Sequence, residues 1–150
     1  MTGLQKARAL AVAIPGGLLA GAYISQYGFG LYPCEMCLWQ RWPHFAALAL
    51  AAISFVLPPQ RLWVFLAGLA ILTSGLIGGF HAGVEYHWWE GITGCTSDVG
   101  AIDVMDINAA PIIRCDVAPW SLFGISLAGW NFLISVIGGG TVMALAALRK

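Results

Sequence analysis

Charged side chains are scarce in this sequence of 150 residues. Asp, Glu, Lys and Arg make up only 9% of it, hydrophobic residues make up 59%, and the mean hydropathy is +0.80. Soluble domains carry about a quarter charged residues, so this chain has too little charge to cover a water-exposed surface. The composition predicts an integral membrane protein. The formal net charge is zero and no basic tract is present, so we expect no nucleic-acid partner.

Long polar segments are also few. Four apolar stretches approach or exceed the ~20 residues that a helix needs to cross a bilayer, at about 9–27, 38–57, 62–84 and 122–148. Only the connection at about 85–121 is long. We therefore expect a single all-α domain over residues 1–150, folded as a four-helix membrane bundle. A cleaved signal peptide is disfavoured for the first stretch, because no small-residue cleavage site ends it.

Positive charges gather on one side of the predicted spans, and this sets the orientation. That side holds Lys6, Arg8, Arg61, Arg149 and Lys150. The other side holds Arg41, Arg114 and every acid, namely Glu35, Glu85, Glu90, Asp98, Asp103, Asp106 and Asp116. Both termini are therefore expected in the cytoplasm, with loops at about 28–37 and 85–121 facing outward.

Small residues recur at four-residue spacing within the predicted spans. Gly17 and Gly21 form one such pair, and a second series consists of Gly75, Gly79 and Gly83. Small residues at this spacing let membrane helices approach closely. We expect both series to lie at contacts between helices.

Only four cysteines are present, and all fall in the outward loops. Cys34 and Cys37 form a C-x-x-C pair, a spacing that is often redox-active. Haem attachment is excluded because residue 38 is Leu rather than His. A disulfide between Cys95 and Cys115 would close a loop of about 20 residues, a stabilisation of roughly 3 kcal/mol. Purely structural disulfides and a zinc site therefore remain alternatives, although the long spacing of the second pair suits zinc poorly.

Arg41 lies four residues after Cys37 and shares a helix face with it. An arginine where the chain enters the bilayer needs a partner or must reach the headgroups. Its charge would favour a Cys37 thiolate or a reduced, anionic redox partner. His81, Glu85 and His87 lie near the outer end of the third stretch, and His81 and Glu85 are four residues apart and can pair. A proton-handling role is one alternative for these residues, and interfacial hydrogen-bonded histidines are the favoured one. The sequence does not decide the roles of His44, His81 and His87.

Two runs resemble the bacterial disulfide bond formation protein B family. The first is CEMCLWQR at 34–41, and the second is CDVAPWSLFGISLAGW at 115–130, which matches the entry to that family's last helix. Four spans, internal termini and two outward cysteine pairs match as well. The resemblance covers essentially the whole chain and implies a multi-pass protein of the bacterial inner membrane with its cysteine loops in the periplasm.

The resemblance also implies a thiol oxidase. Cys95 matches the cysteine that a periplasmic thioredoxin-fold (DsbA-like) donor attacks, and Cys115 matches its disulfide partner. Electrons would pass to Cys34 and Cys37, and then to a membrane quinone, ubiquinone or menaquinone, near Arg41. No metal is expected in this reading.

Two rival functions remain at this point. A quinone or vitamin K epoxide reductase type of protein also has four helices and a C-x-x-C, but that motif belongs near the end of its bundle. A membrane scaffold whose disulfides only staple the outward loops would need no redox partner. Quinone-dependent turnover separates this scaffold from an enzyme.

Overall fold

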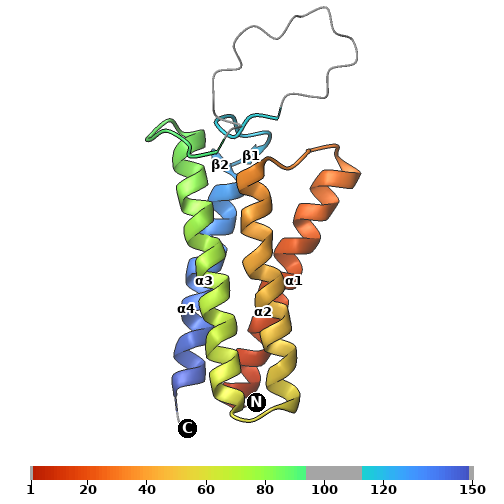
Figure 1. The fold of residues 1–150 in the computed structure, drawn as a ribbon, viewed down its shortest axis with the longest axis vertical. Coiled ribbons are helices and arrows are strands. Elements are labelled where there is room, and N and C mark those ends of the chain that lie inside the picture. Colours follow the sequence, from red (N-terminus) through yellow and green to blue (C-terminus); the bar gives the residue numbers. More distant parts are fainter. Residues whose placement is uncertain (1, 94–112, 149–150) are drawn as a thin grey trace, which may run out of the picture.

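The computed structural model describes residues 2–93 and 113–148. Cys95, Arg149 and Lys150 lie outside the described residues. The chain forms four helices and one short hairpin (Figure 1). These elements are α1 (Gly3–Gly28), α2 (Glu35–Val56), α3 (Gln60–Glu85), β1 (Ser121–Leu122), β2 (Ile125–Ser126) and α4 (Leu127–Ala147).

Three of these helices, α1, α3 and α4, are long and apolar enough to cross a membrane. Helix α2 has 22 residues, about 33 Å at 1.5 Å per residue, so its length also suffices. Its outer half carries Gln40, Arg41 and His44, and these residues lower its hydropathy. The prediction of a membrane protein is supported by three helices, and the fourth span stays a prediction.

Side chains at the helix starts explain where the helices begin. Thr2 and Gln5 form a reciprocal capping box, which starts α1 ahead of its apolar run. Cys34 caps α2 because its Sγ accepts a hydrogen bond from the Cys37 N–H. Helix α2 therefore starts three residues before the predicted span, and the first cysteine of the C-x-x-C pair has a structural role as its cap.

The last helix starts later than the sequence suggested. Residues 122–126, predicted to be helical, lie in the hairpin, whose turn places Phe123 and Gly124 at positive φ. A non-glycine residue adopts this conformation rarely, and a helix cannot pass through it. Ser126 then caps α4 by accepting from the Gly129 N–H.

Helix α3 lies between α2 and α4 and packs against both. An added Cβ at Gly75 would lie 2.9 Å from the Ser135 side chain, and one at Gly79 would lie 2.7 Å from the Phe132 ring. These glycines therefore allow α3 and α4 to approach closely. The same expectation is wrong for Gly17 and Gly21, because a Cβ at either position would meet no atom within 4 Å.

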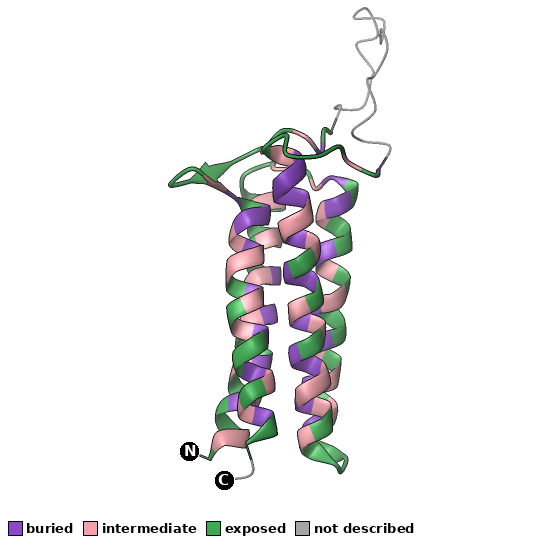
Figure 2. Ribbon diagram, turned by 90° about the vertical axis from the view of Figure 1, so that its left-hand side faces the viewer, coloured by how far each residue is buried: buried purple, intermediate pink, exposed green. Residues whose placement is uncertain are grey.

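The two ends of the molecule carry different parts of the chain. Both termini and the α2–α3 turn lie at one end, and the hairpin and the connection after α3 lie at the other (Figure 1). We call these the terminal end and the loop end. Buried residues recur along every helix, so the helices share one interior (Figure 2). At the terminal end, Arg61 donates to the carbonyls of Ala146 and Leu148, and Arg8 donates to that of Ser54.

Candidate functional site

The C-x-x-C pair lies at the loop end, at the first turn of α2. Cys34 is 5% exposed, and its Sγ lies 2.8 Å from that of Cys37. A disulfide would place the two sulfurs about 2.05 Å apart. Both cysteines are free thiols in this structure. The two sulfurs are therefore in contact but not bonded, as in a reduced dithiol.

Cys115 packs against this dithiol although it is far away in sequence. It is fully buried, at 0% exposure, in one apolar cluster with Cys34, Met36 and Val84. It is also disulfide-bonded. Its sequence partner in our prediction, Cys95, lies outside the described residues, so that pairing stays a prediction. The structure thus brings one cysteine of the long connection against the C-x-x-C pair.

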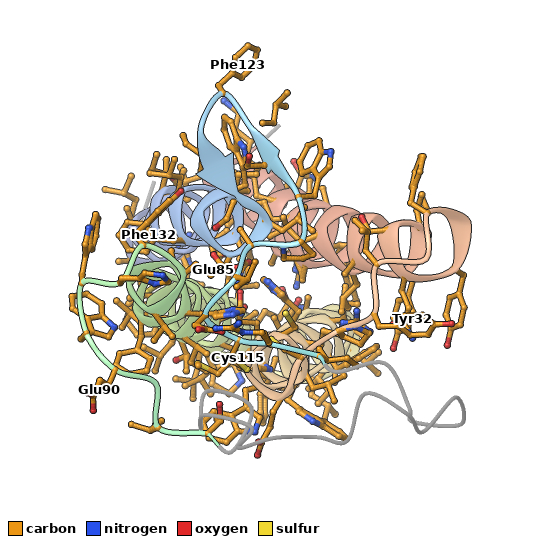
Figure 3. The ribbon with its side chains drawn as sticks, turned by 90° about the horizontal axis from the view of Figure 1, so that it is seen from above. Tyr32, Glu85, Glu90, Cys115, Phe123 and Phe132 are labelled. Carbon is orange, nitrogen blue, oxygen red and sulfur yellow. The ribbon has the colours of Figure 1, made fainter. Side chains whose placement is uncertain are left out.

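Two ionisable side chains from α3 complete the surroundings of Cys34. His81 is 1% exposed, and its Nε2 lies 3.5 Å from the Cys34 Sγ. The same nitrogen lies 3.8 Å from the Glu85 Oε1, and the Glu85 side chain is 2% exposed. Glu85 and Cys115 lie together over the middle of the helices in Figure 3, whereas Glu90 projects from the rim.

A chain of buried polar groups continues from His81 into the interior. The Gln40 Nε2 lies 2.9 Å from the His81 Nδ1, and the Gln40 Oε1 accepts from the Asn131 Nδ2 at 2.9 Å. The Asn131 Oδ1 lies 3.0 Å from the His44 Nε2 and accepts from Ser135 at 2.9 Å. Buried polar groups need such partners, and here they link α2, α3 and α4.

A cavity of about 470 Å³, which we call the loop cavity, opens above the dithiol. It lies between the first turn of α2, the end of α3 and the segment around Cys115. The chemically active side chains that line it are Cys34, Cys37, His81, Glu85 and Arg114.

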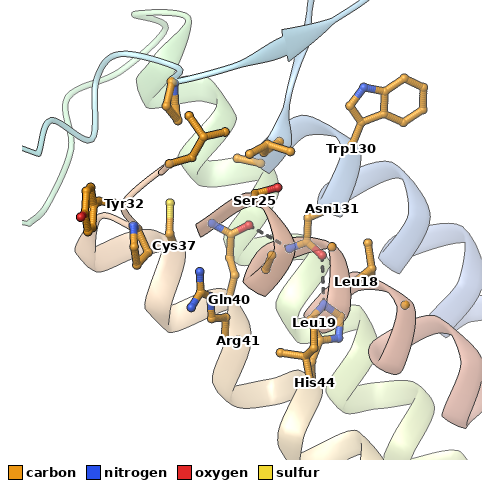
Figure 4. Close-up of a pocket in the computed structure, with 18 residues that line it drawn as sticks. Leu18, Leu19, Ser25, Tyr32, Cys37, Gln40, Arg41, His44, Trp130 and Asn131 are labelled. Carbon is orange, nitrogen blue, oxygen red and sulfur yellow. Dashed lines mark hydrogen bonds between the residues drawn. The ribbon is translucent and has the colours of Figure 1, made fainter. Parts of the chain in front are cut away.

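A second cavity of about 220 Å³, the inner cavity, lies between α1, α2 and α4. Its walls are mostly apolar, and Gly17 and Gly21 line it, which accounts for the open space beside them. Its polar groups include Gln40, Arg41, His44 and Asn131, and Figure 4 shows how these side chains lie with Cys37 around one space.

Arg41 is held at the wall of the inner cavity by α1. Its Nη1 donates to the Gln26 Oε1 at 2.7 Å, and its Cζ lies 4.8 Å from the centroid of the Tyr23 ring. A cation over an aromatic face is attracted to it. The guanidinium is thus fixed in place beside the cavity that Cys37 also lines.

Of the residues that the sequence indicated, the structure brings Cys34, Cys37 and Cys115 together and places Arg41 near Cys37. The sequence analysis missed Gln40 and Asn131. A detectable signal existed, because amide side chains are unusual within apolar spans and usually have a specific partner. Their partners, however, come from other helices and cannot be read from the chain.

Comparison with known proteins gives one consistent family. The family model described as "Disulfide bond formation protein DsbB" matches residues 5–146. "Disulfide bond formation protein B" of Verminephrobacter eiseniae is 31% identical over 139 residues, which cover 87% of this chain and 78% of that protein. The protein of the same name from a Polaromonas species is 31% identical over 146 residues, covering 88% and 86%. No solved structure matches the chain.

The family model spans nearly the whole chain, including the C-x-x-C motif, Arg41 and the entry to α4. Three helices suited to a membrane and a dithiol formed by the buried Cys34 and the half-buried Cys37 agree with this match. The chain therefore belongs to the disulfide bond formation protein DsbB family, and this membership implies a role in disulfide bond formation.

Proposed function

We propose that this protein is a membrane thiol:quinone oxidoreductase. It reoxidises a periplasmic thioredoxin-fold, DsbA-like disulfide donor and passes the electrons to a membrane quinone, thereby supporting disulfide formation in exported proteins. Cys34, Cys37, Cys95 and Cys115 carry the thiol chemistry in this proposal, and Arg41 contributes to quinone binding.

The observation that carries the proposal is the position of Cys37 between two cavities. Cys37 lines the loop cavity, into which Cys34 and the segment around Cys115 also face, and it lines the inner cavity together with Arg41. A single side chain can therefore exchange electrons with a cysteine of the long connection on one side and with a small apolar acceptor on the other.

The shared burial of Cys34 and Cys115 in one cluster supports a definite order of thiol exchange. A donor thiolate attacks Cys95 and breaks its bond to Cys115, which leaves as a thiolate. The Cys115 thiolate then attacks the Sγ of Cys34, forming a Cys34–Cys115 bond and breaking the bond to Cys37. Attack of this kind needs the sulfurs in contact, and Cys34 and Cys115 already share one buried cluster.

The inner cavity suits a quinone head group. Small-molecule sites are mostly apolar with a few placed polar groups, and this cavity has apolar walls with Arg41, Gln40 and His44 among its polar groups. A bound quinone supplies the capacity to accept two electrons and two protons. Cys37 leaves the exchange as a thiolate at this cavity, where the Arg41 charge favours the anion.

The charge distribution supports an inner-membrane location with a cytoplasmic terminal end. Arg8 and Arg61 lie on helices near the terminal end, whereas Glu85, Glu90 and Asp116 lie at the loop end. Lys and Arg are enriched on cytoplasmic sides of membrane proteins. The cysteines then face the periplasm, where thiols are kept oxidised.

Quinone reduction by detergent-purified protein tests the proposal. The protein is given a reduced thioredoxin-fold dithiol donor and, in separate assays, a ubiquinone or a menaquinone analogue, and ultraviolet absorbance follows the reaction. We expect multiple turnovers in the wild type and only background rates in Cys37→Ser. Ser54→Ala, a change near the terminal end, is the matched control and should keep the wild-type rate.

A further variant separates the two cysteine pairs. Cys95→Ser should lose covalent capture of the donor while the Cys34–Cys37 disulfide still forms. Normal capture by this variant would contradict the role assigned to Cys95. Absence of turnover with every quinone and donor tried would favour the alternative, a non-enzymatic membrane scaffold with structural disulfides.

A further inference from the structure

Glu85 is a buried carboxyl group beside the dithiol that the exchange steps leave unused. Its side chain is 2% exposed, and its Oε2 has no hydrogen-bond partner among the described residues. Ser126, at the start of α4, interacts with the same carboxyl group. An ionised carboxylate is unfavourable in such a place unless it is paired. Protonation of Glu85 would therefore remove an unfavourable buried charge.

The hydrogen-bond partners of His81 decide which of its ring nitrogens carries the proton. Since the Gln40 Oε1 accepts from Asn131, the Gln40 amide points its Nε2 at the His81 Nδ1, 2.9 Å away. An amide nitrogen can only donate, so Nδ1 must be the acceptor. The proton of the neutral imidazole then sits on Nε2.

That N–H lies near two acidic side chains, and the backbone of Cys115 also hydrogen-bonds the His81 ring. The His81 Nε2 lies 3.5 Å from the Cys34 Sγ and 3.8 Å from the Glu85 Oε1. It can donate to a Cys34 thiolate or to a Glu85 carboxylate. Two acids that share one site do not both ionise readily, and one of them keeps the proton. Cys34 and Glu85 therefore compete for a single negative charge.

We propose that Glu85 accepts the proton that the Cys34 thiol loses when the dithiol is oxidised, and that the Nε2–H of His81 stabilises the Cys34 thiolate formed in that step. This assignment rests on the function proposed above, because it concerns the same dithiol. Gln40 and Asn131 act as positioning residues, since they hold the His81 tautomer that presents the N–H.

The proton balance is simple. The S–H bond of Cys34 breaks and an O–H bond forms on Glu85, so the negative charge moves from the carboxylate to the sulfur. When the Cys34–Cys37 bond forms, the Cys37 S–H bond breaks, and the electron pair and the Cys37 proton would pass to the acceptor, which would take its second proton from water. The charge on the Cys34 sulfur then disappears. Glu85 then releases its proton into the loop cavity, which it lines.

Other titratable or charged groups face Glu85 and would also affect how the reaction rate depends on pH. Those that line the same cavity are Tyr32 from the α1–α2 connection, Cys34 and Cys37 from α2, His81 from α3, and Arg114 from the segment before Cys115. Ser126 contributes only a hydroxyl from the start of α4.

A single-turnover assay tests the proposal. Reduced protein is mixed with a quinone analogue, and the rate of Cys34–Cys37 oxidation is measured as a function of pH. We expect Glu85→Gln to be about 100-fold slower at neutral pH, in the range of general acid–base effects, and to become faster as pH rises because solvent takes the proton. Glu85→Asp should recover part of the rate. The exposed carboxyl Glu90, changed to Gln, is the matched control and should leave the rate unaltered.

A second measurement needs no quinone. In a Cys37→Ser, Cys95→Ser, Cys115→Ser background, the alkylation rate of Cys34 against pH reports its ionisation. Adding Glu85→Gln should move this profile to lower pH, because no carboxylate repels the thiolate, and adding His81→Asn should move it to higher pH. If Glu85→Gln only damaged the fold, it would not both slow the oxidation of the dithiol and make Cys34 easier to ionise.

The outcomes separate the two proposals. If wild-type protein reduces no quinone, the proposed function fails, and the alkylation profile still decides whether Glu85 and Cys34 compete for charge. If Glu85→Gln keeps both the wild-type oxidation rate and the wild-type alkylation profile, the role of Glu85 is overturned whatever the fate of the proposed function.

Discussion

At the terminal end, the helices pack through small apolar side chains, whereas at the loop end they enclose cavities and polar groups. The terminal cluster consists of Ala7, Ala11, Ala51, Val64, Ala67, Val142 and Ala146, every one of them nearly or fully inaccessible. Toward the loop end, the buried side chains include Gln40, His44, His81 and Asn131. Figure 1 shows α1 leaning away from α2 at this end, where the inner cavity lies.

The two ends therefore suit different tasks: the terminal end holds the helices together, and the loop end offers the groups and space that a reaction needs. Small side chains allow close helix contacts and give a rigid interior. Polar side chains and open space reduce that packing, and they are found where thiols, protons and an apolar acceptor would have to meet. We expect substitutions at the terminal end to affect stability without changing the chemistry, and substitutions of the buried polar groups toward the loop end to affect both.

The largest effect is expected where α3 and α4 cross. A Cβ at Gly139 would lie 2.8 Å from the backbone atoms Gly68 O and Leu72 N, which cannot move aside without displacing the helix. Gly139→Val should therefore destabilise the fold by about 3 kcal/mol, measured by thermal unfolding in detergent. Gly140→Val is the matched control, since a Cβ there meets no atom within 4 Å. Equal losses in both variants would contradict the close crossing.

The next effect concerns the polar network. Asn131→Leu removes a donor to the Gln40 Oε1 and an acceptor for His44 and Ser135. Leaving these buried groups without partners should cost about 2 kcal/mol, again measured by thermal unfolding. Among the described residues, the Ser54 hydroxyl bonds only the Ala51 carbonyl of its own helix, so Ser54→Ala should cost less. A fully stable Asn131→Leu protein would show that the network contributes no stability.

A smaller free-energy change is expected for a substitution at Arg41. It should appear in the KM for quinone rather than in the stability of the fold. Arg41→Ala should raise the KM for quinone about tenfold, equivalent to about 1.4 kcal/mol, with the KM for the donor protein unchanged. Arg61→Ala removes a cation at the terminal end and serves as the control. A quinone KM that responds equally to both variants would count against a specific role for Arg41.

The smallest effect is a pH dependence in the segment after Cys115. Hydrogen bonds from the Arg114 guanidinium, at 2.9 Å and 2.5 Å, lower the pKa of Asp116 below its ordinary value. A carboxyl whose pKa is lower in the folded state stabilises the fold fully above the unfolded pKa of about 3.9. That stabilisation falls as pH drops below this value and is lost below the folded pKa.

Melting temperatures of wild type and Asp116→Asn, measured from about pH 2 to pH 6, test this dependence. The wild-type advantage should be constant at the upper end of this range and vanish at the lower end. A difference that does not change with pH would mean that the Arg114–Asp116 pair has no electrostatic effect on folding.

The residue types and their order in the sequence predicted most of the helices and the end of the molecule that carries the cysteines. Apolar stretches of about the length that a bilayer requires indicated the helices. The clustering of cysteines and acids away from Lys6, Arg8 and Arg61 indicated the end of the molecule where thiol chemistry is expected. These features are local, because hydropathy and charge act on each segment separately. The start of α4 was misjudged because the hairpin turn at Phe123 and Gly124 interrupts a run that remains apolar in composition.

The sequence by itself determined that the chain suits a membrane, where its thiols lie along it, and to which family it belongs. Only the tertiary structure decided that Cys115 shares a buried cluster with Cys34 and that Cys37 lines two cavities. It also decided that the His81 Nε2 lies near both Cys34 and Glu85. The spacing of residues along one helix does not predict which side chains of other helices they will contact. Those contacts follow from how the four helices pack, and Gln40 and Asn131 acquire their roles only there.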